Sequence, residues 1–127
     1  MKIIIRTKKP EAITTLTLCI GPTKRAFYAI RDSHGLKLPE ELILRPVKEY
    51  KEALKRRLTF GRGGIGSDGK YFVALNTRCY KSLNPSCLDT IAHEAAHVAE
   101  LILYNQLTHG REFDALYETA KEAICLK

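Results

Sequence analysis

The stretch DTIAHEAAHVAE, residues 89–100, places two histidines four positions apart, with a glutamate directly after the first. It lies in the longest helical pattern of the chain, predicted over residues 87–106. On a helix, residues four apart stand one turn above the other, so His93 and His97 can direct both imidazoles at one point. The spacing therefore favours a metal site on one face of this helix.

The other residues of this predicted helix are expected to cap it, to support the ligands or to pack in the core. Ser86 fits its N-cap, and Asp89 suits the first turn because a negative charge is favourable at the positive end of the helix dipole. Glu100 and Tyr104 continue the histidine face and are expected to be solvated or to support the ligands. The buried stripe is predicted to contain Leu88, Ile91, Ala95, Val98 and Ile102.

Glu94 has a role separate from that of the two histidines. It is rotated by about 100° from His93, so it does not join the same metal comfortably but can reach a water beside it. Zinc would acidify this water, and Glu94 would remove its proton as the water attacks a carbonyl. A purely structural zinc site has no use for a base at this position.

A catalytic zinc needs a third protein ligand, which leaves a fourth position for water. His109, in the sequence THGREF, follows the helix after a short connection, and Gly110 permits a sharp change of direction. The alternative third ligands are Glu118 and Glu122, on a last helix predicted over about 111–125. The apolar stripe of that helix is predicted to contain Phe113, Leu116, Ala120 and Ile124.

The two motifs together resemble a known family. HEAAH, followed twelve residues after its last histidine by HGREF, is similar to the SprT-like zinc metallopeptidases, which include the Spartan DNA–protein crosslink proteases. The similarity covers about residues 55–115 and is strongest at the two motifs. It implies that Zn²⁺ is the cofactor, that Glu94 is the general base and that Phe113 is a packing residue. The zinc ligands it implies are His93, His97 and His109.

The fold class expected for such a chain is α+β, a compact zincin-like metalloprotease core. A small twisted sheet would pack on helices that include the HExxH metal helix, within a single domain over residues 1–127. Strand patterns occur at 2–7, 13–20 and Tyr71–Leu75, and a helical pattern occurs at 46–58. By the resemblance, the Tyr71–Leu75 strand would lie beside the cleft and hold an extended substrate by strand addition.

Three other segments are less regular. Residues 22–32 fit either a helix that starts at Pro22 or a strand. HGLKLPEEL is predicted to be a loop, with His34 exposed to solvent. GRGGIG, residues 61–66, lacks the Lys-Ser/Thr ending of a phosphate-binding loop and is predicted to be a hairpin turn or a mobile lip.

Composition limits the class of protein. The chain is 45% hydrophobic and 28% charged, which is typical of a soluble globular protein. It has no apolar run long enough to span a membrane and no signal-peptide core, so a cytoplasmic location is expected. The four cysteines form no CxxC pair, which excludes a zinc ribbon and favours unpaired, mostly buried thiols.

Positive charge is concentrated in the first half. Residues 1–60 carry 14 Lys or Arg against 6 acids, a balance of +8, whereas residues 61–127 carry 7 against 8, a balance of −1. A basic face of this kind attracts nucleic acid or acidic proteins, although ordinary solvated lysines give the same composition. DNA is therefore a candidate partner through the N-terminal half.

The sequence predicts a zinc-dependent endopeptidase that hydrolyses protein or peptide substrates, with DNA-associated proteins as one candidate class. The alternative is a zinc-containing binding or adaptor module for nucleic acid or protein, without proteolytic activity. A protease that cleaves a single regulatory partner is also compatible with the same residues.

Overall fold

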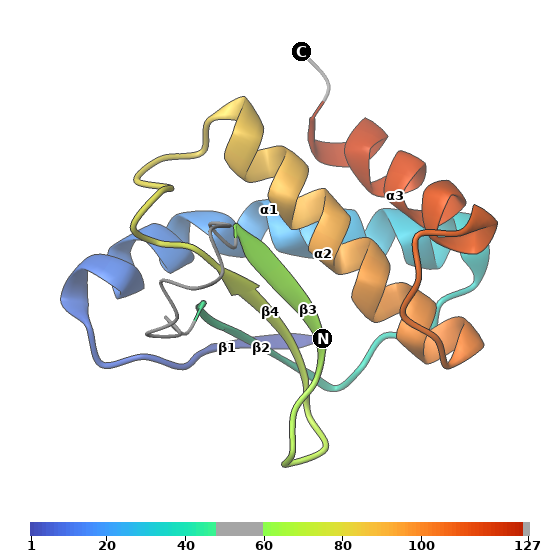
Figure 1. Ribbon diagram of the computed structural model, residues 1–127, viewed down its shortest axis with the longest axis horizontal. Coiled ribbons are helices and arrows are strands. Elements are labelled where there is room, and N and C mark those ends of the chain that lie inside the picture. Colours follow the sequence, from blue (N-terminus) through green and yellow to red (C-terminus); the bar gives the residue numbers. More distant parts are fainter. Residues whose placement is uncertain (48–59, 126–127) are drawn as a thin grey trace, which may run out of the picture.

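The computed structural model describes residues 1–47 and 60–125, which form an α+β fold of four strands and three helices (Figure 1). The strand order is β1-β2-β4-β3. Strands β1, β2 and β4 run parallel to one another, and β3 pairs antiparallel with β4. The strands are β1 (Lys2–Ile5), β2 (Glu41–Pro46), β3 (Gly61–Ile65) and β4 (Tyr71–Leu75).

The helices are α1 (Pro10–His34), α2 (Pro85–Tyr104) and α3 (Arg111–Ile124). Helix α1 packs against β1 and β2, α2 packs against β3 and β4, and α3 lies on α1 and α2 (Figure 1). The core lies between these layers and combines side chains from all three helices with β2 and β4. The expected small sheet packed on helices is therefore present. Among the described residues, no helix is both long enough and apolar enough to cross a membrane.

The prediction of a strand at residues 13–20 is wrong, because this segment belongs to α1. Leu16 is fully buried and Leu18 is 48% exposed, as expected for residues about 200° apart on a helix. Threonine, a weak helix former, is accommodated because its hydroxyl donates to the carbonyl four residues earlier. This occurs at Thr14, Thr15, Thr17 and Thr23.

The ambiguous segment 22–32 is also helical, and Pro22 lies inside α1 rather than at its start. The helix ends at Gly35, whose φ of 69° is the left-handed conformation that glycine adopts without steric cost. His34 is consequently not an exposed loop residue. It is half-buried, and its Nε2 lies 2.8 Å from the Thr119 hydroxyl oxygen on α3.

Two more predictions in the middle of the chain need correction. Part of the predicted loop HGLKLPEEL is strand, since Glu41 begins β2 and Pro46 ends it. Pro46 therefore does not start a helix, and the rest of the predicted helix over 46–58, from residue 48 on, lies outside the described residues. The sequence GRGGIG is not simply a turn, because its first five residues form β3. The strand at Tyr71–Leu75 is confirmed as β4.

The two C-terminal helices agree closely with their sequence patterns. Helix α2 begins two residues before the predicted start, and its N-cap is Asn84, not Ser86. The Asn84 side-chain oxygen accepts from the backbone N–H of Cys87 at 2.8 Å. Asp89 consequently falls after the first turn. The predicted stripe of α3 is buried throughout, and on α2 the three central members, Ile91, Ala95 and Val98, are buried.

The four cysteines are free thiols, as predicted. Cys19 and Cys87 are buried, Cys125 is half-buried and Cys79 is exposed.

Candidate metal centre

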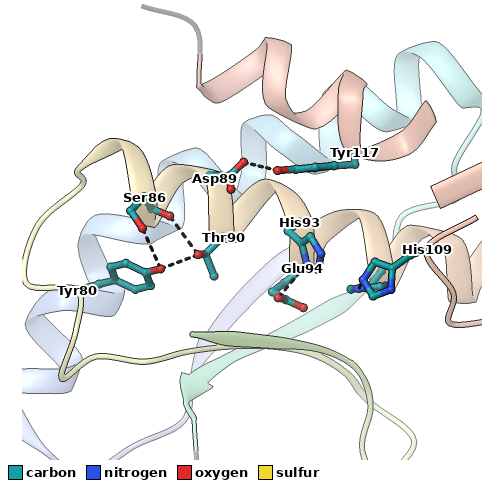
Figure 2. A network of polar contacts seen from close by, with 9 residues as sticks. Tyr80, Ser86, Asp89, Thr90, His93, Glu94, His109 and Tyr117 are labelled. Carbon is teal, nitrogen blue, oxygen red and sulfur yellow. Dashed lines mark hydrogen bonds and ion pairs between the residues drawn. The ribbon is translucent and has the colours of Figure 1, made fainter. Parts of the chain in front are cut away.

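The structure brings His93, His97 and His109 together. His93 lies on α2 and His109 lies in the connection between α2 and α3 (Figure 2). His97 lies one turn beyond His93 on α2. One ring nitrogen from each residue lies within 4.8 Å of one from each of the others. The Nε2 atoms of His97 and His109 are 3.2 Å apart. Residues separated by twelve positions in the sequence thus face each other with their ring nitrogens.

This arrangement fits a zinc ion. Zinc binds histidine nitrogen at about 2.0–2.1 Å in tetrahedral geometry, which separates two ligand nitrogens by about 3.4 Å. The 3.2 Å between the Nε2 atoms of His97 and His109 is close to that value. Burial lowers the pKa of His97 and, together with the neighbouring His93 and His109, outweighs the Glu94 carboxylate, which raises it. A lower pKa favours the neutral imidazole, which is the form that binds a metal.

Phe113, on the first turn of α3, supports all three imidazoles. Its ring stacks on His97 with 4.4 Å between centroids, and it contacts His93 and His109 at 5.1 and 5.0 Å. Phe113 is only 2% exposed, so the three rings rest on a fixed apolar surface. The packing role expected for Phe113 is thereby confirmed.

Glu94 lies beside the cluster and packs against β3. It is 6% exposed, and its Oε2 is 3.1 Å from Nδ1 of His93, a contact that raises the pKa of His93. Two glycines of β3 make room for it. A Cβ at Gly61 would lie 3.0 Å from Glu94 Cγ, and a Cβ at Gly63 would lie 2.5 Å from the Glu94 carbonyl oxygen. The glycine-rich strand therefore packs directly on the backbone and side chain of this carboxylate.

The alternative third ligands lie elsewhere. Glu118 and Glu122 are both exposed on α3, and neither belongs to the group of metal-ligating side chains formed by the described residues. The Glu118 carboxylate instead lies 4.0 Å from the ammonium of Lys121. The geometry thus brings His109 to the two helix histidines and leaves both glutamates outside the cluster.

Two contacts at this site were not apparent from the sequence. The hydroxyl of Tyr117 donates to Asp89 Oδ1, and the Tyr117 ring lies 5.4 Å from that of His93 (Figure 2). Burial raises the pKa of Tyr117, and the bond to Asp89 raises it further. The available signal was spacing: Asp89 precedes His93 by four residues, and Tyr117 follows Phe113 by four, so each pair shares a helix face.

Glu100 is the second residue whose environment the sequence did not reveal. It is fully buried rather than solvated. Burial raises the pKa of its carboxyl, but hydrogen bonds from Thr108 and Gln106 more than offset this, so the pKa lies below its usual value. Those partners lie in the connection that carries His109.

The fold and the cluster define an α+β protein with three histidines placed to hold a metal ion at a helix. The model of the SprT-like family matches residues 32–125, which include all of β2, β3, β4, α2 and α3. The chain therefore belongs to the SprT-like family. No curated protein and no solved structure matches it.

Proposed function

We propose that this protein is a zinc-dependent endopeptidase. The observation that carries the proposal is the convergence of His93, His97 and His109, with the buried carboxylate of Glu94 directly beside them. Membership of the SprT-like family supports the same reading. In this proposal the three histidines hold Zn²⁺ and Glu94 is the general base.

The proposed chemical step depends on two features of the site: the apolar ring of Phe113 that supports the imidazoles, and the carboxylate of Glu94 beside them. A bound zinc ion would supply a Lewis acid that acidifies water and polarises the substrate carbonyl. Glu94 would take a proton from the attacking water and return it to the departing amine nitrogen. The low exposure of Glu94, its packing against β3 and its contact with His93 support this role, because they restrict the side chain to the region beside the histidines. Phe113 would hold the imidazoles in place throughout.

The substrate would lie along β3 rather than β4. Strand β4 pairs with β2 on one side and β3 on the other, so the expected role of Tyr71–Leu75 as the substrate strand is not available to it. Within residues 1–47 and 60–125, strand β3 (Gly61–Ile65) is the end strand of the sheet, and it lies next to α2. An extended peptide added at this edge would pass close to the histidines with its backbone hydrogen-bonded.

DNA remains a candidate partner through the basic first half, whose balance of 14 Lys or Arg against 6 acids favours phosphate contacts. If this is correct, affinity for single-stranded DNA will fall steeply as salt rises, because bound counterions are released. Binding that is absent even at low salt would leave these residues as an ordinary solvated surface.

The test combines metal analysis with proteolysis. We expect purified protein to contain one zinc per chain. We also expect it to cleave an unfolded protein substrate under at least one of two conditions, with or without single-stranded DNA. A chelator should abolish cleavage and added zinc should restore it. Protein that takes up no transition metal contradicts the proposal. Zinc-loaded protein that cleaves nothing under either condition favours the binding or adaptor module.

A further inference from the structure

Glu100 is a fully buried carboxylate one turn beyond His97 on α2. Burying a carboxylate away from water is costly unless hydrogen bonds compensate for the lost solvation. A helix residue that only filled the core at this position would be apolar, as its buried neighbours Val98 and Ala99 are. The hydrogen bonds of Glu100 therefore indicate what the charge does.

Glu100 accepts three hydrogen bonds from the described residues, and each of them comes from the connection between α2 and α3. The backbone N–H of Thr108 donates to Oε1 at 2.8 Å, and the Thr108 hydroxyl donates to Oε2 at 2.5 Å. The side-chain amide of Gln106 donates to Oε2 at 3.0 Å. Both carboxylate oxygens are thus used to hold two residues of one short segment.

This segment ends at His109. The Thr108 hydroxyl oxygen also accepts from the backbone N–H of Gly110 at 3.1 Å, so the hydrogen bonds reach both sides of the histidine. His109 is itself exposed and lies in no helix or strand. Its position next to His97 therefore depends on how the segment around it is held.

We propose that Glu100 is a positioning residue, which fixes the segment Gln106–Gly110 and so presents His109 to His93 and His97 before a metal arrives. The inference rests on the proposed function for the role of His109 as a metal ligand. The hydrogen bonds of Glu100 are present in the structure whatever that function is. Fixing the third imidazole in advance removes an ordering cost that metal binding would otherwise have to meet. The partners that orient metal ligands affect affinity in this way.

Zinc affinity, measured by competition with a chromogenic chelator, provides the first test. We expect Glu100→Gln to weaken zinc binding by about 10- to 100-fold, since the amide cannot accept all three bonds. Thr108→Val, which removes one hydroxyl and keeps the shape, should weaken it in the same direction by less. Glu112→Gln removes the same charge from an exposed position on α3 and should leave the affinity unchanged.

A structural role alone would not move the next two readouts. The absorption spectrum of bound Co²⁺ depends on the number and geometry of its ligands, so Glu100→Gln should shift it towards that of His109→Ala. In a His109→Ala background, Glu100→Gln should weaken metal binding no further, because both changes act on one ligand. Full additivity of the two losses, or a wild-type Co²⁺ spectrum, would overturn the proposal.

The metal-free protein separates this inference from the proposed function. The amide hydrogen of Thr108 should exchange slowly with solvent in the wild type and rapidly in Glu100→Ala, at equal helix content by circular dichroism. If the wild type binds no metal, the proposed function fails while this measurement still decides whether Glu100 fixes the segment. Equal exchange in both proteins refutes the positioning role whatever the metal result.

Discussion

The two sides of the histidine cluster are held by different interactions. His93 and His97 lie on α2, where the helical repeat sets their spacing and the core fixes the helix. His109 lies in an irregular connection, and the hydrogen bonds that hold that connection end on Glu100, one turn beyond His97 on α2. A change on the helix side therefore acts on chemistry or folding, whereas a change on the loop side can misplace one ligand while the fold survives.

The largest effect is expected from Glu94→Gln on the helix side. The substitution keeps size and polarity but removes the base, so we expect peptide cleavage to fall by about 10²–10⁴-fold. Zinc content should stay at the wild-type level because the three histidines are unchanged. Cleavage assays and elemental analysis on the same preparations measure both quantities.

The combined results on zinc content and activity of Glu94→Gln define the role of this carboxylate and distinguish an enzyme from a binding module. A variant that loses zinc together with activity would show that Glu94 holds the site together rather than serving as its base. A variant that retains every measurable activity would remove the water-activating role and favour a binding module.

The next effect concerns the loop side directly. His109→Ala should weaken zinc binding by more than about 100-fold, since even loss of a residue that only orients a ligand costs about 10- to 100-fold. Glu118→Ala is the control, because the Glu118 side chain is 63% exposed and lies outside the cluster. Chelator competition gives both affinities. If Glu118→Ala strips the metal and His109→Ala does not, the third ligand has been assigned wrongly.

The difference between the helix side and the loop side of the cluster also explains which parts of the site could be predicted from the sequence. The HExxH spacing specifies two imidazoles and a carboxylate locally, so the α2 side of the cluster could be read from a dozen residues. The partners of Glu100 lie six and eight residues away in an irregular segment, and no periodicity encodes them. Only the resemblance to a family supplied His109 over the glutamates of the last helix.

The fold shows a similar division. Helix α3 was predicted because its apolar residues recur with the helical period, and β4 was predicted because Tyr71–Leu75 is a short continuous apolar run. The segment ITTLTLCI in α1 alternates like a strand, yet burial against the other helices decides its conformation. Strand β2, from Glu41 to Pro46, was missed because Pro39 and Pro46 flank a short apolar run, and prolines usually mark loops.

A third effect tests how tightly the helix side is packed. Gly63→Ala would place a Cβ 2.5 Å from the backbone oxygen of Glu94, so either β3 or α2 must shift. We expect a loss of about 1–3 kcal/mol in the free energy of unfolding, with a fall in cleavage activity. Gly64→Ala is the control, since its Cβ would make an ordinary 3.5 Å contact with the Phe72 ring. Denaturant unfolding compares the two, and equal stabilities would show that β3 moves freely beside Glu94.

The smallest effect is expected at Asn105, where the helix side becomes the loop side. Asn105 ends α2 with a φ of 52°, a left-handed conformation that costs most residues about 1–2 kcal/mol but that asparagine adopts more readily. Asn105→Ala should therefore lower the free energy of unfolding by about 1 kcal/mol, whereas Asn105→Gly should stay within about 0.5 kcal/mol. Zinc affinity should fall less than in Glu100→Gln, because Gln106 and Thr108 keep their bonds to the carboxylate. Denaturant unfolding of the metal-free protein and chelator competition measure the two quantities. If Asn105→Ala weakens zinc binding as much as Glu100→Gln does, the turn at the helix end, rather than the buried carboxylate, places the third histidine.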